Sequence, residues 1–434
     1  MSSDVGSIQL RELSVRITKG TTPTKGEGFV PRGVNYIKSE SITADGSIDV
    51  SKFSFIDAET HDKLARSKLR AGNVLFSMAG VYLGKTAVVL PEHLPANTNQ
   101  AVGIVTLDES KADPYFIHYS LQSPACRAWV LRSAAQSAQP NFNLQEIGNL
   151  KIPAFPLARQ KAIANVLRML DDRITLLRET NATLEAIAQA LFQSWFVDFD
   201  PVRAKQEGRA PEGMDEATAA LFPDGFEESE LGLVPRGWRA GMLGTIAQTA
   251  RSQVQVHELH GELHYVGLEH IPRKSLSLTN WGVAAGLESA KSSFRAGDIL
   301  FGKLRPYFHK VVIAPMDGIC STDILVCNAN KPCFYGLVAT QLFSESLITY
   351  ADRLSNGAKM PRVSWKDLAA YDIVIPTDDV AEAYTDTIQP IFDRMSANVL
   401  QAKTLSTLRD TLLPRLISGQ LRLPDAEAAI EEAC

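Results

Sequence analysis

The sequence predicts an α+β protein in which two repeated globular domains are each followed by a long helix. Two observations lead to this prediction. A motif of eight residues returns 225 positions later, and each copy precedes a long stretch with apolar residues at coiled-coil spacing. A chain of 434 residues, 45% of them hydrophobic, can bury the cores of about two to four domains. We expect the two helices to pair as an antiparallel coiled coil.

The repeat is clearest in the motif Leu69–Phe76, which returns as Phe294–Phe301. The later elements also keep their order, which indicates a tandem duplication. They are a strand-like run, a polar loop and a closing Ile-Pro: Thr86–Pro91, Pro140–Asn143 and Ile152-Pro153 in the first copy, and Val311–Pro315, Pro361–Ser364 and Ile375-Pro376 in the second.

The first long helix is predicted over residues 156–200. Its seam residues alternate steps of three and four: Ile163, Leu167, Leu170, Ile174, Leu177, Asn181, Leu184 and Leu191. Asn181 occupies an a position, where one polar residue typically fixes register and partner geometry at some cost in stability. From Ala158 to Asp198 this helix would be roughly 60 Å long.

The second long helix is predicted over residues 377–420. Phe392, Met395 and Val399 continue the same rhythm, and a later phase shift indicates a stutter in the seam. Pro390 and Pro414 are expected to kink or end the helix, so its regular part should be shorter than the pattern. A single amphipathic helix lying on its own domain is the alternative for either stretch. Each apolar stripe is too long for one domain to cover, which favours pairing.

The globular domains are predicted at residues 1–155 and 231–376. Residues 201–230 are rich in Pro, Gly and acidic residues, a composition typical of a linker. Residues 421–434 are expected to form a C-terminal tail.

The net charge of −5 argues against a nucleic-acid partner, because DNA affinity comes largely from Lys and Arg. The distribution of charge is more informative. Residues 1–155 carry 16 Lys and Arg against 14 Asp and Glu, and residues 231–376 carry 15 against 11, giving +2 and +4. Residues 156–230 carry 8 against 14, and residues 377–434 carry 5 against 10, giving −6 and −5. The positive charge of the globular domains supports nucleic-acid binding by those domains.

Motifs for catalysis are missing from the sequence, which contains no H-E-x-x-H, G-x-S-x-G, G-x-G-x-x-G or Asn/Asp-Pro-Pro-Tyr. Ala79–Thr86 fits a relaxed phosphate-loop pattern. It leads into a β-branched strand rather than a helix whose N-terminus could face an anion, so we reject nucleotide binding. No apolar run reaches the roughly 18 residues of a membrane span, and the N-terminus has no signal-peptide pattern. We expect a cytoplasmic protein.

The five cysteines form no C-x-x-C pair, which argues against a disulfide framework and a zinc ribbon. Cys320, Cys327 and Cys333 could form a metal cluster, but no histidine stands at ligand spacing, so we expect no metal and free thiols.

Several segments resemble the specificity subunit of Type I restriction-modification enzymes, over nearly the whole chain. The family usually has Glu-Gln after the exit prolines, whereas this chain has Arg159-Gln160 in the first copy and Asp378-Asp379 in the second. The segments that carry the resemblance are Pro156–Ile163, Leu170–Ile174, Leu191–Phe199, Gly232–Trp238 and Leu412–Gly419.

The resemblance implies a non-catalytic DNA-specificity subunit whose two target-recognition domains are held apart by two antiparallel helices. Because the domains differ at most surface positions, the bipartite duplex target should be asymmetric. The resemblance also implies two methyltransferase subunits docked on the helices, with S-adenosylmethionine bound by them and no cofactor bound by this chain. Endonuclease and translocase subunits would join for restriction.

Residues that read DNA vary with the target, so we choose them by their chemistry. Base edges are read by Arg, Lys, Asn and Gln, and phosphates by Lys, Arg, Ser and Thr. The candidates in polar loops are Lys19, Thr21, Thr22, Lys25, Gln136, Gln139 and Asn141 in the first domain, and Arg251, Gln253, Lys303, Arg305, Tyr307, Asn356, Lys359 and Arg362 in the second. A merely solvated surface is the alternative for each. Asn143 and Ser364 are expected to cap helices instead.

Two other functions remain open. One is a fused methyltransferase or nuclease with a diverged site, which the missing donor-binding motif argues against. The other is a repeat scaffold that binds other proteins rather than DNA, which the small positive excess allows.

Overall fold

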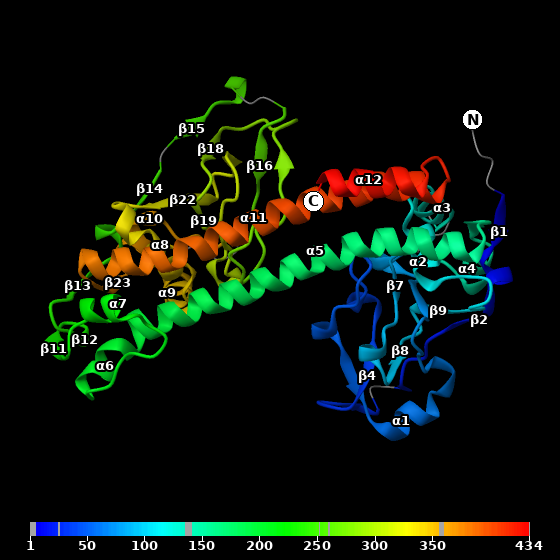
Figure 1. The fold of residues 1–434 in the computed structure, drawn as a ribbon, viewed down its shortest axis with the longest axis horizontal. Helices are drawn as coiled ribbons and strands as arrows, with labels where there is room; N and C mark the ends of the chain where they lie inside the picture. The colour runs from blue at the N-terminus through cyan, green and yellow to red at the C-terminus, as the bar shows by residue number, and fades with distance from the viewer. Residues whose placement is uncertain are drawn as a thin grey trace. The chain divides into compact units, whose positions relative to one another are not determined.

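The computed structural model describes residues 6–24, 27–134, 141–250, 252–258, 261–355 and 360–433. It has two compact units, which we call unit 1 (Met1–Arg173 with Thr404–Cys434) and unit 2 (Ile174–Lys403). Helix α5 (Leu157–Phe192) and helix α11 (Asp378–Ile417) are the two longest elements, and each contributes residues to both units (Figure 1). The predicted fold class, repeated α+β domains with two long antiparallel helices, is confirmed.

Unit 1 contains two four-stranded sheets, which we call the inner and outer sheets. The inner sheet is antiparallel, in the order β2 (Ser14–Lys19), β9 (Val102–Leu107), β6 (Val74–Ser77) and β7 (Thr86–Val88). The outer sheet has the order β3 (Phe29–Val30), β5 (Ser54–Ile56), β4 (Val34–Ile37) and β8 (Ala96–Thr98). Besides short 3-10 turns, the described part before α5 also contains β1 (Ser7–Gln9), β10 (Lys151–Pro153), α1 (Ala58–Lys63), α2 (Pro114–Gln122), α3 (Pro124–Ala134) and α4 (Leu144–Gly148).

Unit 2 repeats this plan. Its inner sheet has the order β14 (Ala247–Thr249), β22 (Ile324–Ala329), β19 (Ile299–Gly302) and β20 (Val311–Ile313). Its outer sheet has the order β15 (Gln253–Val254), β18 (Lys291–Phe294), β21 (Gly318–Cys320), β16 (His264–Val266) and β17 (Gly282–Val283). The elements that follow β22 are α8 (Tyr335–Phe343), α9 (Glu345–Leu354), α10 (Trp365–Ala369) and β23 (Asp372–Ile375), and β23 pairs with β13 (Arg239–Met242).

Small details of the repeat are preserved as well. The backbone N–H of Arg70 donates to the side chain of Asn73 at 2.9 Å, and the N–H of Arg295 donates to Asp298 at 2.8 Å. The glycines inside these two turns, Gly72 and Gly297, have φ of 81° and 87°, a left-handed conformation that favours glycine. Equivalent capping boxes begin α4 and α10, where Asn143 and Ser364 accept from the backbone of the third helical residue, as predicted.

Residues 201–230 differ from the predicted linker. They contain most of α6 (Asp200–Gln206), all of α7 (Glu216–Leu221), strand β11 (Phe226–Ser229) and a turn leading to β12 (Gly232–Pro235). The Pro and Gly content marks real turns between these short elements. The few apolar side chains decide the packing, because Val202 and Phe222 are buried and Phe222 contacts Trp195 edge to face at 5.0 Å.

Two expectations for the C-terminal part were wrong. Helix α11 runs through Pro390 and Pro414 for 40 residues, because a proline removes one helical hydrogen bond, a loss that the buried residues of this helix offset. The predicted tail, 421–434, contains helix α12 (Leu423–Ala433), which buries Ala426 and Ile430.

Candidate nucleic-acid interface

One edge of the inner sheet of unit 1 gathers several of the predicted DNA-reading residues. Strand β2 ends at Lys19, which pairs with Gly103 near the start of β9, and β6 ends at Ser77, which pairs with Val102. The loops that leave these strand ends therefore meet at a single edge of the sheet.

Backbone hydrogen bonds hold these loops together. The N–H of Thr21 donates to the carbonyl of Thr98 at 3.0 Å, and the N–H of Phe142 donates to the carbonyl of Met78 at 2.8 Å. An isolated β-bridge joins Asn141 to Ala79. Among the predicted residues at this edge, Lys19, Thr22 and Asn141 are exposed and Thr21 is half-buried.

Gly20 explains why the loop can lie so close to its neighbour. A Cβ atom at this position would lie 2.1 Å from the carbonyl oxygen of Thr98, so any other residue would push the loop away. The sequence Lys19-Gly20-Thr21 therefore places a cation and a hydroxyl beside the β8–β9 turn.

The equivalent edge of unit 2 gathers the other group of predicted residues. The N–H of Arg305 donates to the carbonyl of Pro361 at 2.8 Å, and the N–H of Val363 donates to the carbonyl of Lys303 at 3.2 Å. An isolated bridge between Leu304 and Arg362 corresponds in the repeat to the bridge between Ala79 and Asn141. Lys303, Arg305, Tyr307 and Arg362 thus lie on two loops that are hydrogen-bonded to each other.

Three cationic groups at this edge have defined partners. The Arg362 guanidinium is paired with Asp323, with Nε 3.0 Å from Oδ1. The guanidinium of Arg273, which the sequence analysis missed, lies 3.9 Å from the ring centre of Phe308, and Arg305 lies 5.8 Å from the same ring. Arg273 is distant in sequence from this loop, so only tertiary structure reveals the contact.

The backbone at this edge is strained. Lys274, Arg305 and His309 have φ of 51°, 51° and 49°, a left-handed conformation that is uncommon for residues other than glycine. Such residues cluster at functional sites, where the surrounding structure holds them in place. Burial lowers the pKa of Lys310, and the nearby Arg273 lowers it further, while Glu269 acts in the opposite direction.

Not all predicted residues join these edges. Gln253 is exposed on β15, an edge strand of the outer sheet. The remaining candidates, Lys25, Gln136, Gln139, Arg251, Asn356 and Lys359, lie outside the described residues.

Most of the predicted seam residues are buried, whereas Leu184 and Leu191 are half-buried. The buried ones are Ile163, Leu167, Leu170, Ile174, Leu177, Asn181, Phe392, Met395 and Val399. Two polar contacts join the helices in antiparallel order: Asp171 with Arg409 in unit 1, and Asn181 with Asn398 in unit 2.

Among the described residues, the structure explains why the phosphate-loop pattern and the cysteines do not form a nucleotide or metal site. Thr86, the last residue of the phosphate-loop pattern, is buried at the start of β7 and hydrogen-bonded to the ring of His118 at 2.9 Å. Cys320 and Cys327 are buried, and burial raises the pKa of both thiols. Within the described part of the chain, no three His, Cys, Asp or Glu residues are grouped as metal ligands would be, and no helix is long and apolar enough to cross a membrane.

Comparison with known proteins agrees with the resemblance. Residues 3–186 match a family model described as the Type I restriction modification DNA specificity domain. The chain is 26% identical over 330 residues to the Type I restriction enzyme HindI specificity subunit of Haemophilus influenzae, covering 65% of this chain and 71% of that one. It is 21% identical over 348 residues to the MjaIX specificity subunit of Methanocaldococcus jannaschii, covering 76% and 74%.

The fold is similar to a crystal structure of the Type-I restriction-modification system S subunit from M. genitalium. The TM-score is 0.55 with 16% sequence identity, covering 95% of this chain and 96% of that chain. The domain match, the relatives and the shared fold agree: residues 3–186 match the Type I restriction modification DNA specificity domain, and the chain as a whole is similar to Type I restriction enzyme specificity subunits.

Proposed function

We propose that this chain reads an asymmetric two-part duplex DNA sequence, one part with each unit, as the specificity subunit of a Type I restriction-modification complex. One observation carries the proposal. In both units some of the polar residues chosen from sequence lie at the equivalent edge of the inner sheet, where equivalent bridges join Asn141 to Ala79 and Arg362 to Leu304. Two surfaces of common origin would then face two stretches of duplex.

The two edges have different chemistry, which supports unlike half-sites. The edge of unit 1 carries Lys19, Thr22 and Asn141, whereas that of unit 2 carries Arg305, Tyr307 and Arg362. Arg prefers to pair with guanine and Asn with adenine in the major groove, so the two edges should select different bases.

The partners would be two methyltransferase subunits, which bind S-adenosylmethionine and perform the chemistry, with endonuclease and translocase subunits joining for restriction. Within unit 2, helix α5 offers a docking stripe for the methyltransferases, because Leu176 and Ile187 are 51% and 44% exposed. They are 11 residues apart, about three helical turns, so they lie on one helix face. Large apolar side chains exposed along one face are typical of a protein-binding surface.

The test is to co-express the chain with its methyltransferase subunit and map methylated bases in the host genome. We expect one bipartite motif with unlike halves and a fixed spacer. Methylation without a bipartite motif, or none in an assembled complex, would contradict the proposal. A mobility shift on duplex DNA at two salt concentrations separates it from a repeat scaffold, which would show no DNA dependence with or without the methyltransferase.

A further inference from the structure

Each unit contains a buried polar junction where α5, α11 and the recognition domain meet. In unit 2 the junction is centred on Asn181, which is 5% exposed and lies opposite Asn398, which is 1% exposed. The Asn398 amide donates to Asn181 Oδ1 at 2.8 Å, and Asn181 Nδ2 donates to the carbonyl of Met395 at 2.9 Å and to Ser277 Oγ at 3.3 Å. One side chain therefore bonds α11 twice and the recognition domain once.

A second polar contact on α5 also holds the recognition domain of unit 2 against this helix. The carboxylate of Glu185, one helical turn after Asn181, accepts from the backbone N–H of Leu276 at 2.7 Å and from Ser275 Oγ at 3.1 Å. Glu185 is 8% exposed, and burial raises its pKa. The segment Ser275–Ser277 is thus fixed against one face of α5 by two successive turns of the helix.

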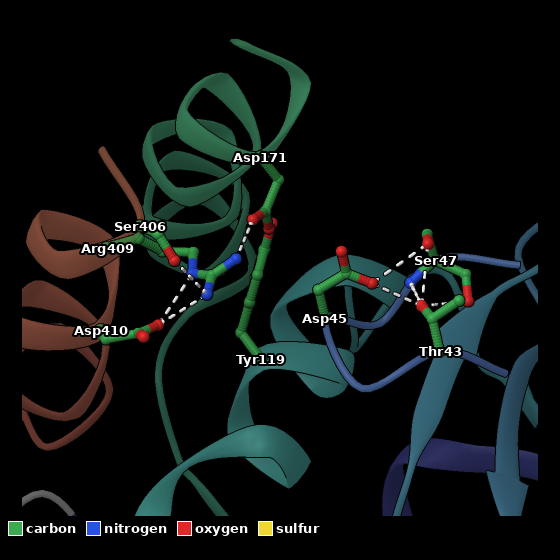
Figure 2. A network of polar contacts seen from close by, with 8 residues as sticks. All are labelled: Thr43, Asp45, Ser47, Tyr119, Asp171, Ser406, Arg409 and Asp410. Carbon is green, nitrogen blue, oxygen red and sulfur yellow. Dashed lines mark hydrogen bonds and ion pairs between the residues drawn. The ribbon is translucent and has the colours of Figure 1, made fainter. Parts of the chain in front are cut away.

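The junction of unit 1 is built from different residues (Figure 2). Asp171 on α5 accepts from Arg409 Nη1 on α11 at 2.6 Å and from the hydroxyl of Tyr119 on α2 at 2.5 Å. Arg409 also donates to Asp410 at 2.7 Å and to Ser406 at 3.3 Å. Tyr119 is 3% exposed, so its hydroxyl depends on Asp171 for a partner.

Neither junction is needed simply to hold the helices together. Apolar residues at such positions usually stabilise a helix pair at least as well as polar ones do. Polar pairs differ because their hydrogen bonds form in only one register of the two helices. A slip of one residue moves a side chain by about 1.5 Å along the helix and turns it by about 100°, which leaves buried polar groups without partners. The apolar seam residues around Asn181, such as Leu177 and Met395, have no comparable preference for one register.

We propose that these two junctions are register locks: Asn181, Asn398, Asp171, Arg409 and Tyr119 fix each recognition domain on the helix pair and so determine the spacer length that the complex accepts. The proposal rests on the proposed function and deepens it. The five side chains are positioning residues, since they act through the placement of the domains on the helix pair.

The experiment uses the full chain in the assembled methyltransferase complex. The variant N181L/N398L replaces both buried amides with apolar side chains of similar size, and Y119F removes one hydroxyl from the junction of unit 1. N165L is the matched control, because Asn165 is an exposed residue of the same helix. Each complex methylates a duplex library in which the two half-sites are constant and the spacer varies by one base pair at a time.

We expect the wild type and N165L to methylate one spacer length strongly. In N181L/N398L the ratio of methylation at neighbouring spacers to methylation at the preferred spacer should rise about tenfold, with equal or higher thermal stability, while half-site preferences stay unchanged. Y119F should give a smaller rise in the same ratio.

An unchanged spacer ratio in both variants would overturn the proposal. If N181L/N398L does not assemble, Y119F decides alone, because it removes a single oxygen and keeps the aromatic packing. A wild-type complex that recognises no bipartite site would instead contradict the proposed function. Failure of the register-lock proposal alone would look different: the wild type would recognise a bipartite site, and neither variant would change its spacer preference.

Discussion

Arg362 and Asp323 form an ion pair at the interface edge of unit 2, with Nε 3.0 Å from Oδ1. The pair is partly exposed, at 47% and 31%, so it adds little stability. Its consequence is geometric, because it holds the guanidinium in one direction beside Lys303 and Arg305.

The first prediction concerns this side chain. R362A should weaken binding to the half-site read by unit 2 by about 1–3 kcal/mol, which is the usual effect of losing an Arg–base contact, and leave the other half-site unaffected. Competition mobility shifts with duplexes altered in one half-site measure this. R353A, at an exposed position on α9, is the control. An equal loss of affinity for all duplex sequences would show that Arg362 contacts phosphates rather than bases.

The second prediction concerns the edge of unit 1. K19A/N141A should relax the base preference of the half-site read by unit 1 only, because Lys19, at the end of β2, and Asn141 both lie at the inner sheet edge. Mapping methylated sites for the variant complex tests this. A change in the other half-site would show that the two edges do not read separately.

The third prediction concerns the exposed stripe of α5. L176D/I187D should weaken binding of the methyltransferase subunit at least tenfold, since two carboxylates would have to be desolvated in the interface. Co-purification and sedimentation measure assembly. L231D changes an apolar residue outside the helices that is 41% exposed, and it should assemble normally. Normal assembly of L176D/I187D would place the docking surface elsewhere.

The fourth prediction concerns pH. Burial, with a smaller contribution from the Arg409 charge, lowers the pKa of His118 to about 4. Between pH of about 6.5 and 4 the unfolded chain binds this proton and the folded chain does not. Stability should therefore fall as pH decreases through this window, by on the order of 3 kcal/mol. H118Q should show a weaker dependence in thermal denaturation across this range, whereas H257Q, on unit 2, should match the wild type.

The fifth prediction concerns Pro390, an exposed residue inside α11. P390A should stabilise the protein by about 1–3 kcal/mol, because alanine restores a helical hydrogen bond and removes a backbone clash. The expected increase in Tm is about 2–4 °C per kcal/mol. R394A on the same helix should leave Tm nearly unchanged, and a lower Tm for P390A would show that proline fits a distortion of α11.

Much of the fold could be predicted because its pattern is local. The repeat of Leu69–Phe76, the capping residues Asn143 and Ser364 and the spacing of the seam each depend on nearby residues. Residues 201–230 were misjudged because their composition marks turns, whereas the packing of Phe222 on Trp195 depends on the fold. The length of α11 was underestimated because the free-energy cost of Pro390 in a helix was considered without the stabilisation from its buried neighbours.

The polar contacts between distant segments could be predicted least. Asn181 was identified by its seam position, but nothing in its neighbourhood points to Asn398 or Ser277. Tyr119 and Arg409 lie on elements far from Asp171 in sequence, and Arg273 lies far from Phe308. Such pairs follow from tertiary packing, and an antiparallel alignment of the two seams is the sequence feature that could have identified Asn398.

The division into units has a consequence for synthesis on the ribosome. Unit 2 is one continuous stretch, Ile174–Lys403, whereas unit 1 combines Met1–Arg173 with Thr404–Cys434. Although its sheets are made first, unit 1 lacks Arg409 and the rest of its second helix until translation has passed the whole of unit 2. Domains generally fold as they emerge from the ribosome, so the N-terminal sheets should remain without their second helix while unit 2 folds.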